Sequence, residues 1–180
     1  MAHLDLETDL KYPIGRYQAP TTISVDQRSA WIEEMANLPA NLTKAISGLS
    51  DAQLDTPYRP GGWTVRQVVH HIPDSHMNSY VRFRLALTEN SPLIKPYEEA
   101  AWAELADAKN APVAPSLAIL EGLHARFVLM LRSLSAADFA RTFRHPEVGE
   151  NRLDWTLGLY AWHSRHHVAQ ITALRTRQAW

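Results

Sequence analysis

Two histidines near the end of the chain have the spacing of a metal-binding pair on a helix. The segment WHSRHH covers residues 162–167, and within it His163 and His167 are four residues apart. On a helix this spacing places both side chains on one face, one turn apart. The same face carries an apolar stripe formed by Leu153, Tyr160, Ile171 and Leu174. Both imidazoles are therefore expected to point at the protein core.

A pair of buried imidazoles needs hydrogen-bond partners that a plain core does not supply. Each ring nitrogen requires a partner, and two stacked rings satisfy each other poorly. A divalent metal ion solves this problem, because neutral imidazole is its most common protein ligand. The alternative is two core histidines bonded to backbone or tyrosine, since this spacing also arises by chance. His166 is expected near Trp155 and Trp162, as a packing or surface residue.

A second histidine cluster, HHIPDSH at residues 70–76, offers a further ligand. Neighbouring helical residues are about 100° apart, so His70 and His71 do not both enter one site easily. His71 lies slightly nearer the apolar stripe of this helix, and the residues alone leave the choice open. The face of His71 continues with a polar row, which consists of Ser75, Asn78 and Arg82. This row indicates a polar substrate pocket, with Arg82 as an anion partner, or else the solvated side of an amphipathic helix.

Three further residues of this cluster have separate interpretations. His76 lies on the apolar side and is expected to be a core histidine with satisfied hydrogen bonds. Pro73 removes one helical hydrogen bond, so it is expected to kink the helix close to His71. Asp74 shares the face of His70 and is a poor candidate for a general base, and the chain has no HExxH motif.

Three imidazoles from two helices would leave a coordination position of a divalent ion open. An open position is typical of catalytic sites, whereas structural sites have four protein ligands. A metal-bound water at such a site becomes a nucleophile near neutral pH. The chain contains no cysteine, so no protein thiolate can close the site or act as a nucleophile.

Helix caps and prolines indicate the elements that position these residues. Long helices are expected at residues 24–49, 64–89, 116–134 and 154–177, with a short helix at 98–108, a helical turn at 135–138 and a loop or small hairpin at 145–152. Ser24 and Thr64, each followed three residues later by glutamine, have the form of capping boxes. Asp154 is expected to cap the last helix, and Pro39 to bend or interrupt the first.

The predicted fold class is an all-α four-helix bundle with one long crossover. Strand signals are sparse, and about 26 residues connect the second and third long helices. Antiparallel neighbours in bundles are usually joined by only about 2–8 residues. A connection this long can cross the bundle and make the two helices parallel.

Composition limits the classes of partner. The chain has 180 residues, which fits a single domain, with residues 1–20 interpreted as an N-terminal extension. The formal net charge of −1 gives no electrostatic basis for a nucleic-acid or anionic-membrane partner. No apolar run approaches the roughly 20 residues of a membrane helix, and the start of the chain lacks the apolar stretch of a signal peptide. A cytoplasmic location is expected.

Longer segments of the chain resemble the YfiT-type branch of the DinB-like superfamily. The resemblance is carried by GGWTVRQVVHHIPDSHMNSYVRFRLALTEN, IKPYEEAAW and LGLYAWHSRHH, together with YPIG at residues 12–15 and FRHPE at 143–147. It covers nearly the whole chain. It implies a four-helix bundle in up-down-down-up order with a three-histidine metal site.

The resemblance also identifies the ligands by position. In that family the ligand of the second helix follows a tryptophan by eight residues and precedes an aliphatic residue. Counting from Trp63 gives His71, which precedes Ile72, so the resemblance implies His71 rather than His70. The ligands of the fourth helix correspond to His163 and His167. This chain has Pro73 where members commonly have alanine, which puts the local helix geometry in question.

The function implied by the resemblance is that of a metal-dependent hydrolase, with one zinc or nickel ion per chain and a homodimer as the assembly. The wider superfamily suggests a second reading, a transferase that joins a low-molecular-weight thiol, such as a bacillithiol-like compound, to an electrophile. The ion would then hold the sulfur of the cosubstrate as thiolate. A non-catalytic metal-binding module is the third reading. All three use the same site, and the sequence does not name the small-molecule substrate.

Overall fold

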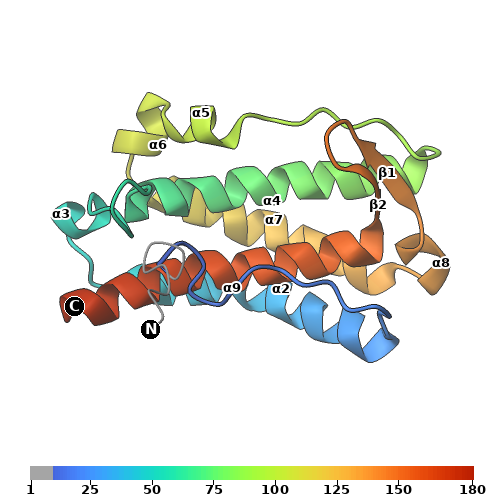
Figure 1. The fold of residues 1–180 in the computed structure, drawn as a ribbon, viewed down its shortest axis with the longest axis horizontal. Helices are drawn as coiled ribbons and strands as arrows, with labels where there is room; N and C mark the ends of the chain where they lie inside the picture. Colours follow the sequence, from blue (N-terminus) through green and yellow to red (C-terminus); the bar gives the residue numbers. More distant parts are fainter. Residues whose placement is uncertain (1–9) are drawn as a thin grey trace, which may run out of the picture.

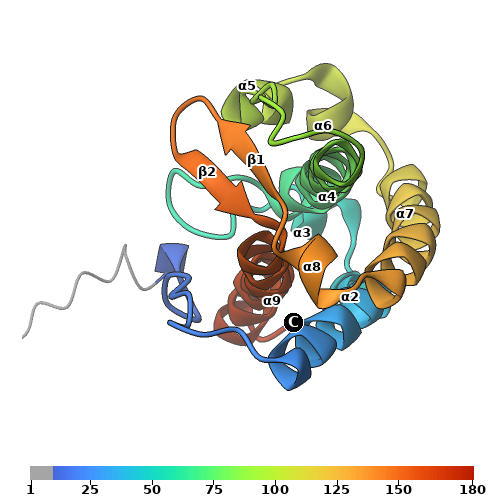
Figure 2. The same ribbon diagram turned by 90° about the vertical axis from the view of Figure 1, so that its right-hand side faces the viewer.

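Four long helices run side by side in a computed structural model that describes residues 10–180. They are α2 (Val25–Ile46), α4 (Val65–Thr88), α7 (Ala114–Ser133) and α9 (Leu153–Gln178). Each packs against two of the others, and Figure 2 shows this arrangement from the end of the bundle. The predicted four-helix bundle is therefore confirmed.

The order of helix directions is up-down-down-up. Figure 1 shows α4 and α7 running in one direction and α2 and α9 in the other. The chain between α4 and α7 returns along the bundle and carries two short helices, α5 (Glu99–Ala103) and α6 (Ala106–Asn110). One helix was expected here, but extended backbone at Leu105 separates the two. This crossover places α5 and α6 beside the first half of α4.

Two helix starts differ from the predicted ones. α7 begins at Ala114 rather than Ser116, because Pro115 fits the first turn of a helix, where its missing N–H costs nothing. The cap residue of α9 is Arg152, whereas Asp154 lies in the first turn and forms an ion pair with Arg152. The cap at Thr64 is a complete capping box with Gln67, as expected.

The remaining elements are short. α3 (Asp51–Leu54) lies between α2 and α4, and α8 (Ala136–Phe139) forms the helical turn expected after α7. The strands β1 (Thr142–His145) and β2 (Gly149–Arg152) pair antiparallel as a hairpin. The hairpin begins three residues before the expected segment and leads directly into α9.

Both helix-internal prolines are accommodated without a break. α2 continues through Pro39, and α4 continues through Pro73 from Val65 to Thr88. Neither proline interrupts its helix, so His71 lies on a continuous helix. Proline still lacks an N–H, which leaves the backbone carbonyl four residues before it without its helical donor.

α7 is the one described helix that is long and apolar enough to cross a membrane, judged by length and composition. The sequence had been expected to contain no such segment. Leu120, Phe127 and Leu131 of α7 are buried in the core, whereas Ile119 and Leu129 are exposed. The apolar residues of α7 are therefore divided between an inner and an outer face.

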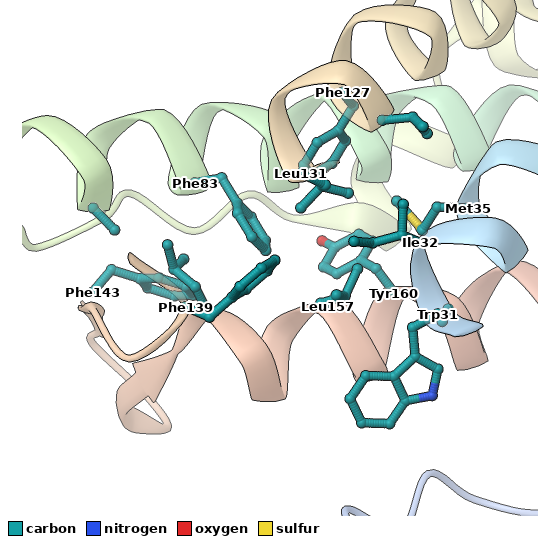
Figure 3. Close-up of a cluster of buried hydrophobic side chains, with 14 of the residues drawn as sticks. Trp31, Ile32, Met35, Phe83, Phe127, Leu131, Phe139, Phe143, Leu157 and Tyr160 are labelled. Atoms are coloured by element: carbon teal, nitrogen blue, oxygen red, sulfur yellow. The ribbon is translucent and has the colours of Figure 1, made fainter. Parts of the chain in front are cut away.

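Two hydrophobic clusters fill the bundle. The first lies toward the hairpin and is drawn in Figure 3; it includes Trp31, Met35, Phe83, Phe127, Phe139, Phe143, Leu157 and Tyr160. The second lies toward the other end of the bundle and includes Leu38, Leu42, Leu54, Val65, Val69, Ile72, Leu120 and Ile171. Burial of these apolar surfaces is the main stabilising contribution to the fold.

Histidines form a polar layer between the two clusters: His76 on α4, His124 on α7, and His163 and His167 on α9. On α7, His124 lies between Leu120 of the second cluster and Phe127 of the first. On α9, the two histidines lie between Tyr160 of the first cluster and Ile171 of the second. The layer thus crosses the interior between two apolar regions, where an unpaired polar group would be costly.

Candidate metal centre

Three imidazoles from α4 and α9 converge on one point. The Nε2 atom of His163 lies 3.3 Å from Nε2 of His71 and 3.1 Å from Nε2 of His167. One ring nitrogen from each residue lies within 4.8 Å of the other two. The i, i+4 spacing on α9 supplies two of the rings, and the packing of α4 against α9 brings the third.

The orientation of His167 is set by a glutamine one turn further along α9. The Gln170 amide nitrogen donates to the backbone carbonyl of Lys11 at 3.0 Å, which leaves the amide oxygen as an acceptor. That oxygen lies 2.8 Å from Nδ1 of His167. His167 therefore carries its hydrogen on Nδ1, and its Nε2 presents a lone pair to the centre of the group.

The three converging nitrogens cannot satisfy one another as neutral rings. Nε2 of His163 contacts two other nitrogens, and Nε2 of His167 offers only a lone pair. A single hydrogen on Nε2 of His163 could point at Nε2 of His71 or at Nε2 of His167, but not at both. A divalent cation accepts all three lone pairs at once, so the donor set fits a metal ion.

Burial keeps these imidazoles in the form that binds a metal. Desolvation, with a smaller contribution from the nearby His166, lowers the pKa of His71 to about 4. Desolvation also lowers the pKa values of His163 and His167 well below the ordinary value, with smaller contributions from the adjacent histidines. All three rings are neutral at pH 7, and a metal ion would not have to displace protons.

A cavity of about 340 Å³ opens over the three imidazoles. Its lining includes the three histidines, His166, Tyr12, Trp63, Trp162, Arg59, Lys11 and Glu99. The indole of Trp63 lies against His71, with ring centroids 4.8 Å apart. Glu99 begins α5 and is the acidic residue in this lining. Glu99 lies in the segment IKPYEEAAW, but it could not be assigned to the site from the sequence, because only the fold brings the crossover to the cavity.

The segment before α2 forms one wall of the cavity. Its backbone carbonyl at Gly15 accepts a hydrogen bond from the indole N–H of Trp162 at 3.1 Å. The ring of Tyr12 lies against His166, with centroids 5.5 Å apart. The described part of the predicted N-terminal extension therefore packs along α9; residues 1–9 lie outside the described residues.

The other histidines of the two clusters have separate partners. His70 points away from the group: its Nδ1 lies 2.7 Å from the Ser116 hydroxyl, and its Nε2 3.2 Å from the Ala111 carbonyl. His166 stacks on Trp162 at a centroid distance of 4.5 Å, as a packing role predicts. The structure thus brings His71, and not His70, to the two histidines of α9.

The polar row on α4 does not line the cavity, contrary to expectation. Ser75 is buried beside the Tyr160 hydroxyl at 3.5 Å, and Asn78 donates to the backbone carbonyl of Asp74. The Nε atom of Arg82 is buried with no hydrogen-bond partner among the described residues. Asp74 is also absent from the lining, and burial raises its pKa to about 6. Ser75 is buried and the other two residues of the row are half-buried, and none of the three lies in the lining of the cavity over the histidines.

Comparisons with known proteins agree with this geometry. The chain matches the family model described as the DinB superfamily over residues 34–171. A protein from Bacillus cereus strain 03BB102 is 58% identical over 172 residues, which is 96% of this chain and 99% of the relative. It is named "Putative metal-dependent hydrolase". A protein from Bacillus thuringiensis subsp. konkukian has the same identity and coverage and a name of the same form.

Solved structures show the same fold. YfiT from Bacillus subtilis, described as "a probable metal-dependent hydrolase with an unusual four-helix bundle topology", superposes with a TM-score of 0.93. It is 52% identical in sequence and covers 96% of this chain and 99% of its own. Another four-helix bundle protein, with 21% identity and a TM-score of 0.54, shares the fold alone. The chain belongs to the DinB superfamily, in the branch that contains YfiT.

Proposed function

We propose that the chain is a metal-dependent hydrolase acting on a small molecule, with one zinc or nickel ion held by Nε2 of His71, His163 and His167. The observation that supports this most directly is the convergence of three neutral imidazole nitrogens at the floor of a cavity. The group contains no fourth ligand among the described residues. Three protein ligands with an open side are typical of catalytic zinc sites.

The ion would supply Lewis acidity, which makes a water molecule nucleophilic near neutral pH. The residues around it would orient the substrate and move the proton. Glu99 provides a carboxylate in the lining of the cavity, so we assign to it the role of proton acceptor. Its place on the exposed crossover keeps it in contact with solvent, to which the proton can pass.

The cavity suits a small substrate with an apolar portion. Its volume of about 340 Å³ is at the lower end of the range for small-molecule sites. The rings of Trp63, Trp162 and Tyr12 supply apolar walls. We infer that the substrate is an ester or amide whose apolar group packs against these rings while its carbonyl faces the histidines.

A panel of substrates on the zinc-loaded and nickel-loaded protein tests this function. Esters and amides are offered in one series, and a small thiol with an electrophile in a second series. Hydrolysis that disappears in His167→Ala and persists in His70→Ala supports the proposal, since only His167 belongs to the group. Turnover in the thiol series alone would mean that the protein is a thiol transferase and not a hydrolase. Absence of turnover in both series would favour a non-catalytic metal-binding module.

A further inference from the structure

Two buried histidines lie behind His163, on the side away from the cavity. Nδ1 of His163 lies 3.2 Å from Nε2 of His76 on α4. Nδ1 of His76 lies 3.0 Å from Nε2 of His124 on α7, and Nδ1 of His124 lies 2.7 Å from the backbone carbonyl of Met35 on α2. The contacts form one continuous chain through all four long helices.

We propose that this chain, the His76–His124 relay, holds His163 in the tautomer whose Nε2 is free of hydrogen and directed at the metal position. His76 and His124 would then be positioning residues for the ligand His163. The inference rests on the proposed function, because it assumes that His163 binds an ion. Neither His76 nor His124 lies in the lining of the substrate cavity.

The direction of every hydrogen bond in the relay follows from its last member. A backbone carbonyl can only accept, so Nδ1 of His124 carries the hydrogen. A neutral imidazole has one N–H, so Nε2 of His124 accepts from Nδ1 of His76. By the same argument Nε2 of His76 accepts from Nδ1 of His163. Nε2 of His163 is left with a lone pair, the arrangement that a metal ligand requires.

The order of donors and acceptors in the relay requires neutral rings, and burial favours them. His76 is fully buried, and His124 is 2% exposed. A charged imidazolium in such an interior would lose its hydration, so the neutral form is favoured at both positions. A charged ring carries hydrogen on both nitrogens, so it could not accept the hydrogen bond from the preceding ring in the relay. The order of donors and acceptors therefore holds for neutral rings.

A proline makes the terminal carbonyl available. In an uninterrupted helix the Met35 carbonyl would accept the N–H of residue 39, but that residue is Pro39, which has none. The Met35 carbonyl is therefore free for His124 at 2.7 Å. The proline in α2 and the histidine in α7 are 85 residues apart in sequence and meet through this one acceptor.

The zinc affinities of three variants and one control test the relay. His124→Phe keeps the volume of the ring but removes the acceptor for His76, which can then present an N–H to His163. Loss of such outer contacts typically weakens metal binding about 10–100-fold, and we expect a decrease of that order. His124→Gln should recover much of the affinity, because an amide offers both a donor and an acceptor. His76→Phe should lose as much as His124→Phe.

His70→Phe is the matched control for burial. His70 lies on α4, is buried and has two hydrogen-bond partners, but it does not contact the metal group. Its replacement should change the melting temperature of the metal-free protein without changing zinc affinity. If wild type binds zinc and His124→Phe binds it with equal affinity, the relay is wrong but the proposed function is unaffected. A wild-type protein that binds neither zinc nor nickel would overturn the proposed function and this inference with it.

The tautomers themselves can be observed by long-range ¹H–¹⁵N NMR of the histidine rings. In metal-free wild type the relay requires hydrogen on Nδ1 of both His76 and His124. In the same metal-free protein it also requires hydrogen on Nδ1 of His163, a state that a merely structural role for the two histidines would not impose. Hydrogen on Nε2 of His76 or His124 would contradict the proposed order, whatever the affinities.

Discussion

The backbone carbonyl of Met35 lies one helical turn before Pro39 and accepts its hydrogen bond from the ring of His124, at 2.7 Å, instead of from α2. Replacement of Pro39 by alanine would supply the missing N–H and create a competing donor for this carbonyl. We expect Pro39→Ala to weaken zinc binding, by less than His124→Phe does, because a carbonyl has a second lone pair. Competition titration against a chromophoric chelator measures the difference.

Pro73→Ala serves as the control for that variant. It makes the same change in the middle of α4, where the carbonyl of Val69 would regain a donor. Val69 has no part in the relay, so zinc affinity should stay at the wild-type value. Equal affinities in Pro39→Ala and wild type would mean that the Met35 carbonyl serves both donors without loss.

Removal of a proposed ligand should remove the ion. His163→Ala deletes the nitrogen that contacts both other members of the group, and the protein should lose most of its metal. His70→Ala and His166→Ala should retain it, because their rings have other partners. Elemental analysis of the purified variants gives the metal content per chain. Retention of metal by His163→Ala would place the ion elsewhere.

Binding of the ion should stabilise the bundle. An ion held by the three nitrogens that α4 and α9 bring together would bind only the folded state, and a hundredfold excess over the dissociation constant would contribute about 2.7 kcal/mol to the free energy of unfolding. Thermal unfolding of the zinc-loaded protein should therefore occur at a higher temperature than after complete chelation at pH 7. His167→Ala should show no such shift.

The metal-free protein should lose stability as the pH falls from about 6.5 toward 4. Desolvation lowers the pKa of His124 in the folded protein to about 4, from the ordinary value of 6.5 for a histidine in water. Between these values the unfolded chain binds the proton that the buried ring does not, so the free energy of unfolding decreases with falling pH. Denaturant titrations across this range measure the slope. His124→Phe should reduce it, because one buried imidazole that gains a proton on unfolding is then missing.

Glu99→Gln should impair turnover and leave zinc affinity unchanged. The carboxylate lines the cavity and is not a member of the metal group. Loss of a general base typically lowers the rate about 10²–10⁴-fold. Glu98→Gln is the matched control, since the neighbouring residue is not in the lining. A Glu99→Gln enzyme with wild-type turnover would remove Glu99 from the mechanism.

The sequence by itself predicted the four long helices, because caps, prolines and apolar periodicity are local properties of the chain. The capping box at Thr64 and the i, i+4 spacing of His163 and His167 are of this kind. The length of the crossover was enough to predict parallel helices, since a short loop cannot return along a bundle. The starts of α7 and α9 differ from the predicted ones, because Pro115 fits the first turn of α7 and Arg152 is the cap residue of α9.

Tertiary structure alone decided what lies opposite each helix face. Periodicity gives the direction of a side chain around its own helix but not the element packed against it. His124 had no distinguishing signal in the sequence, and it acquires a role because α7 packs it between His76 of α4 and Met35 of α2. The polar row of α4 was expected to face a substrate, but none of its residues lines the cavity over the histidines. The contacts that define the site join residues far apart in sequence, and only the packing of the four helices brings them together.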